Sequence, residues 1–362
     1  ELFQPLAPGI DSDFPPLLTG GTVPHNLPEP ANSLVGRTDD LVALTEHVLE
    51  NRLVTVTGPS GCGKSRLMQE LGWGLLDSFP HGVFWCDASR VGGFDELVSE
   101  IVTALGLKLR QGDPCEFLLD ELSGRTTLLL LDSADGLVED VERFISLFMA
   151  KTRQPRLVVE SRRRLSVSND QNYPLRPLDV PPSDINAAAE LNEFHSTQLF
   201  VERARSHVSQ FEPDGREARA IGTICRRLDG LPLAIELAAA RIGHMTVADI
   251  LDNLDDRFRL LDSAEASKNR PRTLEATFAL SFESLPPVLR QDFLRLCVFE
   301  SGFDVDAADV VLTIDRNLDD EEPIGTFDAL RRIALLIDQS LLRMAISLQG
   351  RSRYSMLESV RL

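Results

Sequence analysis

Short apolar runs alternate with amphipathic patterns over the first half of the chain. Four runs rich in Val, Leu, Phe or Trp have the length and composition of buried strands, namely 53–57, 82–86, 127–131 and 156–160. A weaker fifth run covers 173–175. Between them, apolar residues recur every three or four positions, as on one face of a helix, over 41–49, 67–76, 97–105 and 141–148. Strands that alternate with helices predict an α/β fold with a doubly wound parallel sheet, whose ligand chemistry lies at the carboxyl ends of the strands.

The first strand runs directly into a glycine-rich loop, Gly58-Pro59-Ser60-Gly61-Cys62-Gly63-Lys64-Ser65, followed by Arg66. This loop fits the pattern G-x-x-x-x-G-K-[ST] at every fixed position. Glycines let successive backbone N–H groups face phosphate oxygens, and the positive end of the following helix dipole adds to the attraction. We expect Lys64 to reach the β- and γ-phosphates and the Ser65 hydroxyl to bind Mg²⁺. The sequence therefore predicts a P-loop domain in which residues 58–66 contact a nucleoside di- or triphosphate.

Helical patterns replace the strands beyond Pro181 and Pro182. Apolar positions within 218–228 and 233–242 predict a helical bundle that ends near Leu261, and a polar stretch at 264–272 marks a boundary. The last part carries helical patterns at 274–282, 289–296 and 327–337, and then a hairpin, 341–348 with 353–357. Helices followed by a two-stranded wing predict a winged helix.

These patterns divide the chain into four parts. We expect a proline-rich linker over 1–33, where seven prolines occur without sustained periodicity, and which could lie on the next domain through Phe3, Phe14 and Leu17. The P-loop nucleotide-binding domain covers 34–180, the helical domain 181–263 and the winged-helix domain 264–362. The chain begins without Met and stops inside a helix-like pattern, so we expect it to be a piece of a longer protein.

Charge and cysteine content narrow the classes of function. The 362 residues carry a formal charge of −19, which argues against nucleic-acid binding through the overall electrostatic field of the protein. The five cysteines are odd in number and lack C-x-x-C spacing, as is typical of reduced thiols in a cytoplasmic protein. No run is long enough to span a membrane, so we expect no membrane partner.

Three residues near strand ends have the chemistry of a nucleotide site. Asp132 ends the third strand and can hold Mg²⁺ directly or through water. Asp135 can orient or deprotonate an attacking water, or it is an ordinary acid in an exposed turn. Arg162 follows the fourth strand and can sense the presence of the γ-phosphate. Because Arg163 and Arg164 follow it, Arg162 could instead belong to a solvated basic cluster. With Lys64, Asp135 and Arg162 form the predicted catalytic set, and Ser65 and Asp132 the predicted metal ligands.

Five segments occur in an order that resembles the STAND-class (NB-ARC-type) ATPases. They are 35–37, the phosphate loop, the leucine-rich strand ending in Asp132, 160–162, and 229–237, which includes Gly-Leu-Pro-Leu at 230–233. The resemblance covers about 34–362 and is greatest to the actinobacterial multidomain regulators of LuxR or SARP type. It implies an ATP/ADP switch with Mg²⁺ that is closed with ADP, and open and self-associating with ATP. Effector and sensor domains would lie outside this chain, and the first 30 residues are similar to linkers that follow nucleotide-cyclase domains.

The same resemblance implies further roles. Val35 and Arg37 would lie on the adenine side, Pro232 on the base or ribose, and Arg162 would be the sensor arginine. The chain departs from the family at Thr38, where glutamate is common, and at Asp135, where the second acid is usually glutamate. It also departs at Leu357, where the family has a histidine that touches the ADP β-phosphate.

Two other classes of function compete with a slow signalling ATPase. A transcription factor could read DNA through the winged helix, but the net acidity and a candidate recognition helix (327–339) with only Arg331 and Arg332 as cations speak against it. A small-molecule kinase would need a mobile lid with phosphate-binding arginines and an acceptor pocket, which a winged helix fits poorly.

Overall fold

The computed structural model describes most of the nucleotide-binding and helical regions and parts of the C-terminal region. The described residues are 23–30, 32–108, 112–183, 193–254, 282, 285–299, 302–313, 326–338, 341–346 and 352–356. Within them, no helix combines the length and the apolar content that a membrane span requires. All five cysteines are free thiols, as expected.

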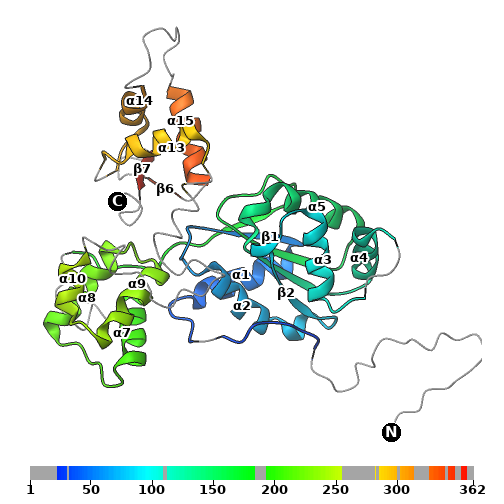
Figure 1. The fold of residues 1–362 in the computed structure, drawn as a ribbon, viewed down its shortest axis with the longest axis horizontal. Coiled ribbons are helices and arrows are strands. Elements are labelled where there is room, and N and C mark those ends of the chain that lie inside the picture. Colours follow the sequence, from blue (N-terminus) through cyan, green and yellow to red (C-terminus); the bar gives the residue numbers. More distant parts are fainter. Residues whose placement is uncertain are drawn as a thin grey trace, which may run out of the picture.

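A parallel five-stranded sheet confirms the predicted fold class (Figure 1). Its strands are β1 (Leu53–Thr57), β2 (Val83–Asp87), β3 (Leu128–Asp132), β4 (Arg156–Ser161) and β5 (Gln171–Pro174). Their order across the sheet is β2-β3-β4-β1-β5. Strand β4 therefore lies between β1, which leads into the phosphate loop, and β3, which ends in Asp132. The carboxyl ends of these three strands meet at one edge, where the candidate site lies.

Helices cover both faces of the sheet. Helices α1 (Thr38–Glu50) and α2 (Lys64–Gly74) pack on the face to which Val54, Val56, Leu130 and Val158 belong. Helices α3 (Phe94–Ala104), α4 (Pro114–Ser123) and α5 (Val138–Lys151) pack on the face of Leu129, Leu131 and Val159. Successive strand residues thus bury alternate side chains in two cores, as the pleat requires.

Helix α4 was not predicted, although its signal is present in the sequence. The Asp113 side chain accepts hydrogen bonds from the backbone N–H groups of Cys115 and Glu116, and Pro114 occupies the first turn. Aspartate before proline at a helix start is a recognised capping signal. The helix then buries three leucines, Leu118, Leu119 and Leu122.

The region after the sheet is helical, as predicted. It contains α7 (His195–His207), α8 (Gly215–Arg227), α9 (Pro232–Ala239) and α10 (Val247–Asp252). Helix α7 is an addition to the prediction. Buried residues of these helices belong to the same hydrophobic cluster as those of α1, α2 and one sheet face. The helical region and the sheet therefore share a continuous core.

Residues from the expected N-terminal linker pack against the sheet. His25 forms a parallel bridge with Val83, and the Asn26 amide makes hydrogen bonds of 2.6 and 2.8 Å to the backbone N–H and C=O of Trp85. Leu27 is buried beside α2, and the Trp73 indole N–H donates to the carbonyl of Pro28. Residues 23–28 thus line the edge of the sheet beside β2. The contacts expected through Phe3, Phe14 and Leu17 lie outside the described residues.

The described C-terminal elements include two of the predicted helices and the predicted hairpin, whereas α14 was not predicted and the predicted helix at 274–282 lies, apart from residue 282, outside the described residues. Helices α13 (Pro287–Leu296), α14 (Val305–Thr313) and α15 (Thr326–Asp338) precede the antiparallel pair β6 (Leu342–Ile346) and β7 (Ser352–Met356). Phe303 and Tyr354 exchange two backbone hydrogen bonds of 2.8 Å, which adds a short third pairing. These elements have their own hydrophobic cluster, separate from the two around the sheet. Leu357 and the boundary stretch 264–272 lie outside the described residues.

Candidate functional site

The loop between β1 and α2 has the backbone of a phosphate cradle. Gly58, Gly61 and Gly63 have φ angles of 152°, 79° and 94°, which side-chain-bearing residues rarely adopt. A Cβ atom on Gly58 would also lie 2.4 Å from the carbonyl oxygen of Leu175. Helix α2 begins at Lys64, directly after the last of these glycines. The loop therefore presents a helix N-terminus at the carboxyl edge of the sheet, as an anion site requires.

Lys64 is buried and fully hydrogen-bonded. Its Nζ atom donates to the carbonyl oxygens of Gly58 and Pro59 at 2.9 and 3.2 Å, and it lies 3.0 Å from Oε1 of Glu160. Burial alone would lower the pKa of Lys64, but the Glu160 carboxylate raises it above its ordinary value. Burial likewise opposes the charge of Glu160, but the neighbouring Lys64 ammonium holds the pKa of that carboxyl below its usual range. The two side chains therefore form a buried ion pair.

Glu160 was not among the predicted site residues. It is the fifth residue of β4, and because that strand lies between β1 and β3, its side chain reaches both the loop and the end of β3. Its Oε2 atom accepts the backbone N–H of Ser133 at 2.8 Å, and the fully buried Asp132 is a further hydrogen-bond partner. The sequence does contain a signal for Glu160, because an acidic residue follows the apolar residues Leu157, Val158 and Val159 near the end of the strand.

Asp135 and Arg162, which were predicted separately, bind each other. Arg162 Nε lies 2.9 Å from Oδ2 of Asp135, and the backbone N–H of Arg162 donates to Oδ1 at 2.6 Å. The Ser161 hydroxyl donates to the same Oδ1 at 3.1 Å. The Asp135 carboxylate, just beyond β3, and the Arg162 guanidinium, just beyond β4, thus form one ion pair.

A cavity of about 1070 Å³ opens above these groups. Its walls come from the phosphate loop, the ends of β3 and β4, the segment before α1, and helices α7 and α9. Sequence-predicted residues that line it are Val35, Arg37, Ser60, Gly61, Cys62, Gly63, Lys64, Ser65, Arg66, Asp135, Arg162 and Pro232. Gly58, Pro59 and Asp132 are not in its lining, but they belong to the same network through Lys64 and Glu160.

The helical region makes direct contact with the phosphate loop. The backbone N–H of Leu233 donates to the carbonyl oxygen of Gly61 at 3.1 Å. Gly230 has a φ angle of 67° and lies close to the backbone of Leu178. A Cβ atom on residue 230 would lie 2.1 Å from the Leu178 carbonyl oxygen. Pro232 packs near Gly63 and lines the cavity. Residues 230–233 therefore join the start of α9 to the loop that is expected to bind phosphate.

Arg37 also contacts the loop backbone. Its guanidinium donates to the carbonyl oxygen of Cys62 at 2.9 Å and pairs with Asp40 at 2.8 Å. The Tyr173 hydroxyl donates to the other oxygen of Asp40 at 2.6 Å. Arg37 thus links Asp40 of α1 to the loop backbone and lines the cavity, whereas its role beside adenine stays a prediction.

Two arginines hold the extended segment before α1. Arg66 of α2 donates to the carbonyl of Asn32, and Arg203 of α7 donates to the carbonyl of Ser33 at 2.9 Å. Arg203 also pairs with Glu236 at 2.9 Å. It lines the cavity but was not predicted, because α7 itself was not. The cavity wall therefore joins three separate parts of the sequence.

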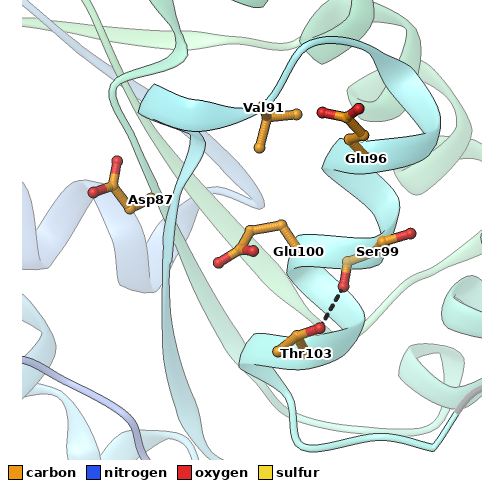
Figure 2. A pocket seen from close by; sticks show the side chains of 6 residues that line it. All are labelled: Asp87, Val91, Glu96, Ser99, Glu100 and Thr103. Carbon is orange, nitrogen blue, oxygen red and sulfur yellow. Dashed lines mark hydrogen bonds between the residues drawn. The ribbon is translucent and has the colours of Figure 1, made fainter. Parts of the chain in front are cut away.

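A second hollow lies beside the end of β2 and the face of α3 (Figure 2). It is lined by Asp87, Val91, Glu96, Ser99, Glu100 and Thr103, and its carboxylates give it an acidic character. Among the described residues, no group of three or more His, Cys, Asp or Glu side chains could hold a metal ion. These carboxylates make the hollow unfavourable for phosphate, so the larger cavity is the better candidate for a nucleotide site.

Comparisons with known proteins agree with this geometry. Residues 48–161, which run from α1 to the end of β4, match the sequence model of an AAA domain. The fold is similar to that of the Walker-type ATPase paby2304 of Pyrococcus abyssi, with a TM-score of 0.56 over 91% of this chain and 95% of that one, at 13% identity. Residues 48–161 thus have the P-loop α/β fold of an AAA domain.

Sequence relatives define the family more closely. The chain is 32% identical to the uncharacterized protein Rv0894 of Mycobacterium tuberculosis over 94% of its own length and 82% of that protein. It belongs to the same family as Rv0894. It is also 31% identical, over 86% of its length, to the M. tuberculosis protein named "Putative HTH-type transcriptional regulator Rv0890c". The chain spans only 33% of that larger protein.

The contribution of Arg37 to the stability of the loop can be tested by substitution. Arg37→Ala removes the bonds to Cys62 and Asp40, so we expect the free energy of unfolding to fall by about 2–3 kcal/mol. Tyr173→Phe is the matched control, because it removes one bond to Asp40 and leaves the loop contact, at a cost of about 1 kcal/mol. Urea denaturation measures both. A loss in Tyr173→Phe as large as that in Arg37→Ala would contradict the role of Arg37.

Proposed function

We propose that this chain is an ATP/ADP-binding STAND-type switch module within a larger regulatory protein. The observation that carries the proposal is the convergence of the phosphate loop, the β3 and β4 ends and residues 230–233 on one cavity. Nucleotide bound there would touch both the sheet and the helical region. Whether ATP or ADP is bound would therefore determine how the two regions are arranged.

The residues present fit a magnesium nucleotide. The cavity, at about 1070 Å³, is slightly larger than the range of about 300–1,000 Å³ for small-molecule sites. Lys64 and the N–H groups of the glycine loop suit the β- and γ-phosphates, and the Ser65 hydroxyl, which lines the cavity, suits Mg²⁺. Asp132 is buried beside Glu160 behind the lining, so it would act on the ion through water. Val35 and Pro232 offer apolar surface for the base or ribose. When bound, Mg·ATP supplies the phosphoanhydride bond whose cleavage resets the switch.

The Asp135–Arg162 pair favours slow turnover. Asp135 can orient water only if its carboxylate is accessible, and here both of its oxygens are engaged by Arg162 and Ser161. The Nε atom of Arg162 is likewise committed to Asp135 while the pair persists. Hydrolysis therefore requires the pair to open, and a long-lived ATP state is what a switch needs.

Self-association in the ATP state is part of the proposal. The family resemblance implies it, and Rv0890c shows that a homologous module can occupy a third of a longer chain. Effector and sensor parts of such a protein would receive the change through the helical region, which shares its core with the sheet.

Direct DNA binding through the winged helix is the second candidate. It is favoured by the name of Rv0890c as an HTH-type transcriptional regulator. In α15, however, Arg332 pairs with the buried Asp292 at 2.9 Å and with Asp328 at 3.4 Å. Arg331 is then the arginine of α15 left for phosphate contacts, which is a weak basis for binding an anionic duplex.

Nucleotide binding is tested by Lys64→Ala. Loss of the ammonium removes the charge that neutralises the β- and γ-phosphates, so we expect ADP and ATP to bind at least about a hundredfold more weakly by isothermal titration calorimetry. Lys151→Ala is the control, since Lys151 forms an exposed pair with Glu116 outside the cavity. Equal affinities in wild type and Lys64→Ala would remove the loop from the site.

The switch is tested by oligomeric state. We expect light scattering coupled to size-exclusion chromatography to show a larger species in Mg·ATP than in Mg·ADP. Lys64→Ala should give the same mass in both nucleotides, because it cannot hold either. A wild-type mass that is independent of nucleotide would contradict a self-associating ATP state and leave nucleotide binding as a separate question.

A further inference from the structure

Lys64 has no unused hydrogen-bond donor in this structure. An ammonium group has three N–H bonds, and Lys64 directs them to Gly58, Pro59 and Glu160. A phosphate oxygen can therefore bind Lys64 only if one of these three partners is displaced.

Glu160 is the partner that can be exchanged. The two carbonyl oxygens belong to the loop backbone, which is fixed by the left-handed glycines and by close contact with Leu175. Glu160 contributes a side-chain carboxylate, which can rotate without movement of the loop. It also carries the negative charge that phosphate would bring, so the exchange replaces one anion by another beside the same ammonium.

We propose that Glu160 is an internal counter-ion that occupies Lys64 in the empty site and competes with the nucleotide phosphates for it. This inference rests on the proposed nucleotide site. The pair is almost fully enclosed, with side-chain exposures of 4% for Lys64 and 8% for Glu160. Buried charges need a partner, so the pair stabilises the empty site. The same carboxylate repels an approaching phosphate. It therefore weakens nucleotide binding and favours release of the nucleotide.

Ser133 extends the effect to the end of β3. Its backbone has φ 61°, and its N–H donates to Glu160 at 2.8 Å. Movement of the Glu160 side chain would release this N–H and thus loosen the turn between Asp132 and Asp135. Occupation of Lys64 by phosphate is in this way connected to the segment that carries the predicted catalytic acid.

Glu160→Gln is the variant that tests the competition. A glutamine keeps the size of the side chain but removes the charge, and its NH2 group replaces one of the two oxygens that face Lys64 and the Ser133 N–H. The empty site becomes less stable and the phosphates lose their competitor, so both effects favour the nucleotide-bound state. We expect fluorescent ADP to bind about tenfold more tightly, because charge-assisted contacts have about this effect or more.

Thermal unfolding supplies the second readout. The empty variant should melt below wild type, and ADP should raise its melting temperature by more than it raises that of wild type. Glu116→Gln is the matched control: Glu116 also lies 3.0 Å from a lysine, Lys151, but in an exposed pair, so neither readout should change. Glu160→Met serves as a second variant of similar length without charge.

Each outcome decides the question. Tighter ADP binding in Glu160→Gln, or variants that fold only with ADP, supports competition. Unchanged or weaker binding in a folded variant, or unfolding that ADP does not reverse, overturns it and makes Glu160 a structural support of the loop. If wild type itself binds neither ADP nor ATP, the proposed function fails instead, which is a separate result.

Discussion

A buried ammonium group requires a carboxylate, and the arrangement of this site follows from that requirement. Lys64 lies at the start of α2 behind the glycine loop and is only 5% exposed, so water solvates its charge poorly. Glu160 meets this need from the neighbouring strand. The pair can form only because β4 lies between β1 and β3, so the strand order is also what brings Asp132, Asp135 and Arg162 to the loop.

The same loop connects the sheet to the helical region. Gly61 accepts a hydrogen bond from the first turn of α9, and Arg37 braces the loop from the segment before α1. Behind these contacts, one hydrophobic cluster runs from the α2 face of the sheet through α7 to α10. Under the proposed function, these contacts would transmit a change in the loop on nucleotide binding to the helices, without a separate linker element.

The fold class and nearly half of the residues that line the cavity could be predicted from the sequence. The strands and the phosphate loop depend on local patterns, whereas Val35, Arg37 and Pro232 were inferred from the family resemblance. The strands are short apolar runs, and the phosphate loop is a contiguous motif whose glycines are needed at their own positions. What the sequence lacked was the lateral order of the strands. The partnership of Lys64 with Glu160 and that of Asp135 with Arg162 both join residues far apart in the chain, and only the position of β4 reveals them. Arg203 was missed for a different reason, since α7 carries polar residues on much of its surface and its apolar stripe is short.

Hydrogen exchange of the backbone amides tests most directly whether nucleotide binding at the loop changes the stability of the helical region. Mass spectrometry would compare the wild-type protein without nucleotide and with Mg·ADP. The account predicts slower exchange in the loop (58–66) and also across 230–239, which includes the Leu233 amide bonded to Gly61, and no change in Lys64→Ala. Protection confined to the loop, with 230–239 exchanging at the same rate in both states, would contradict it.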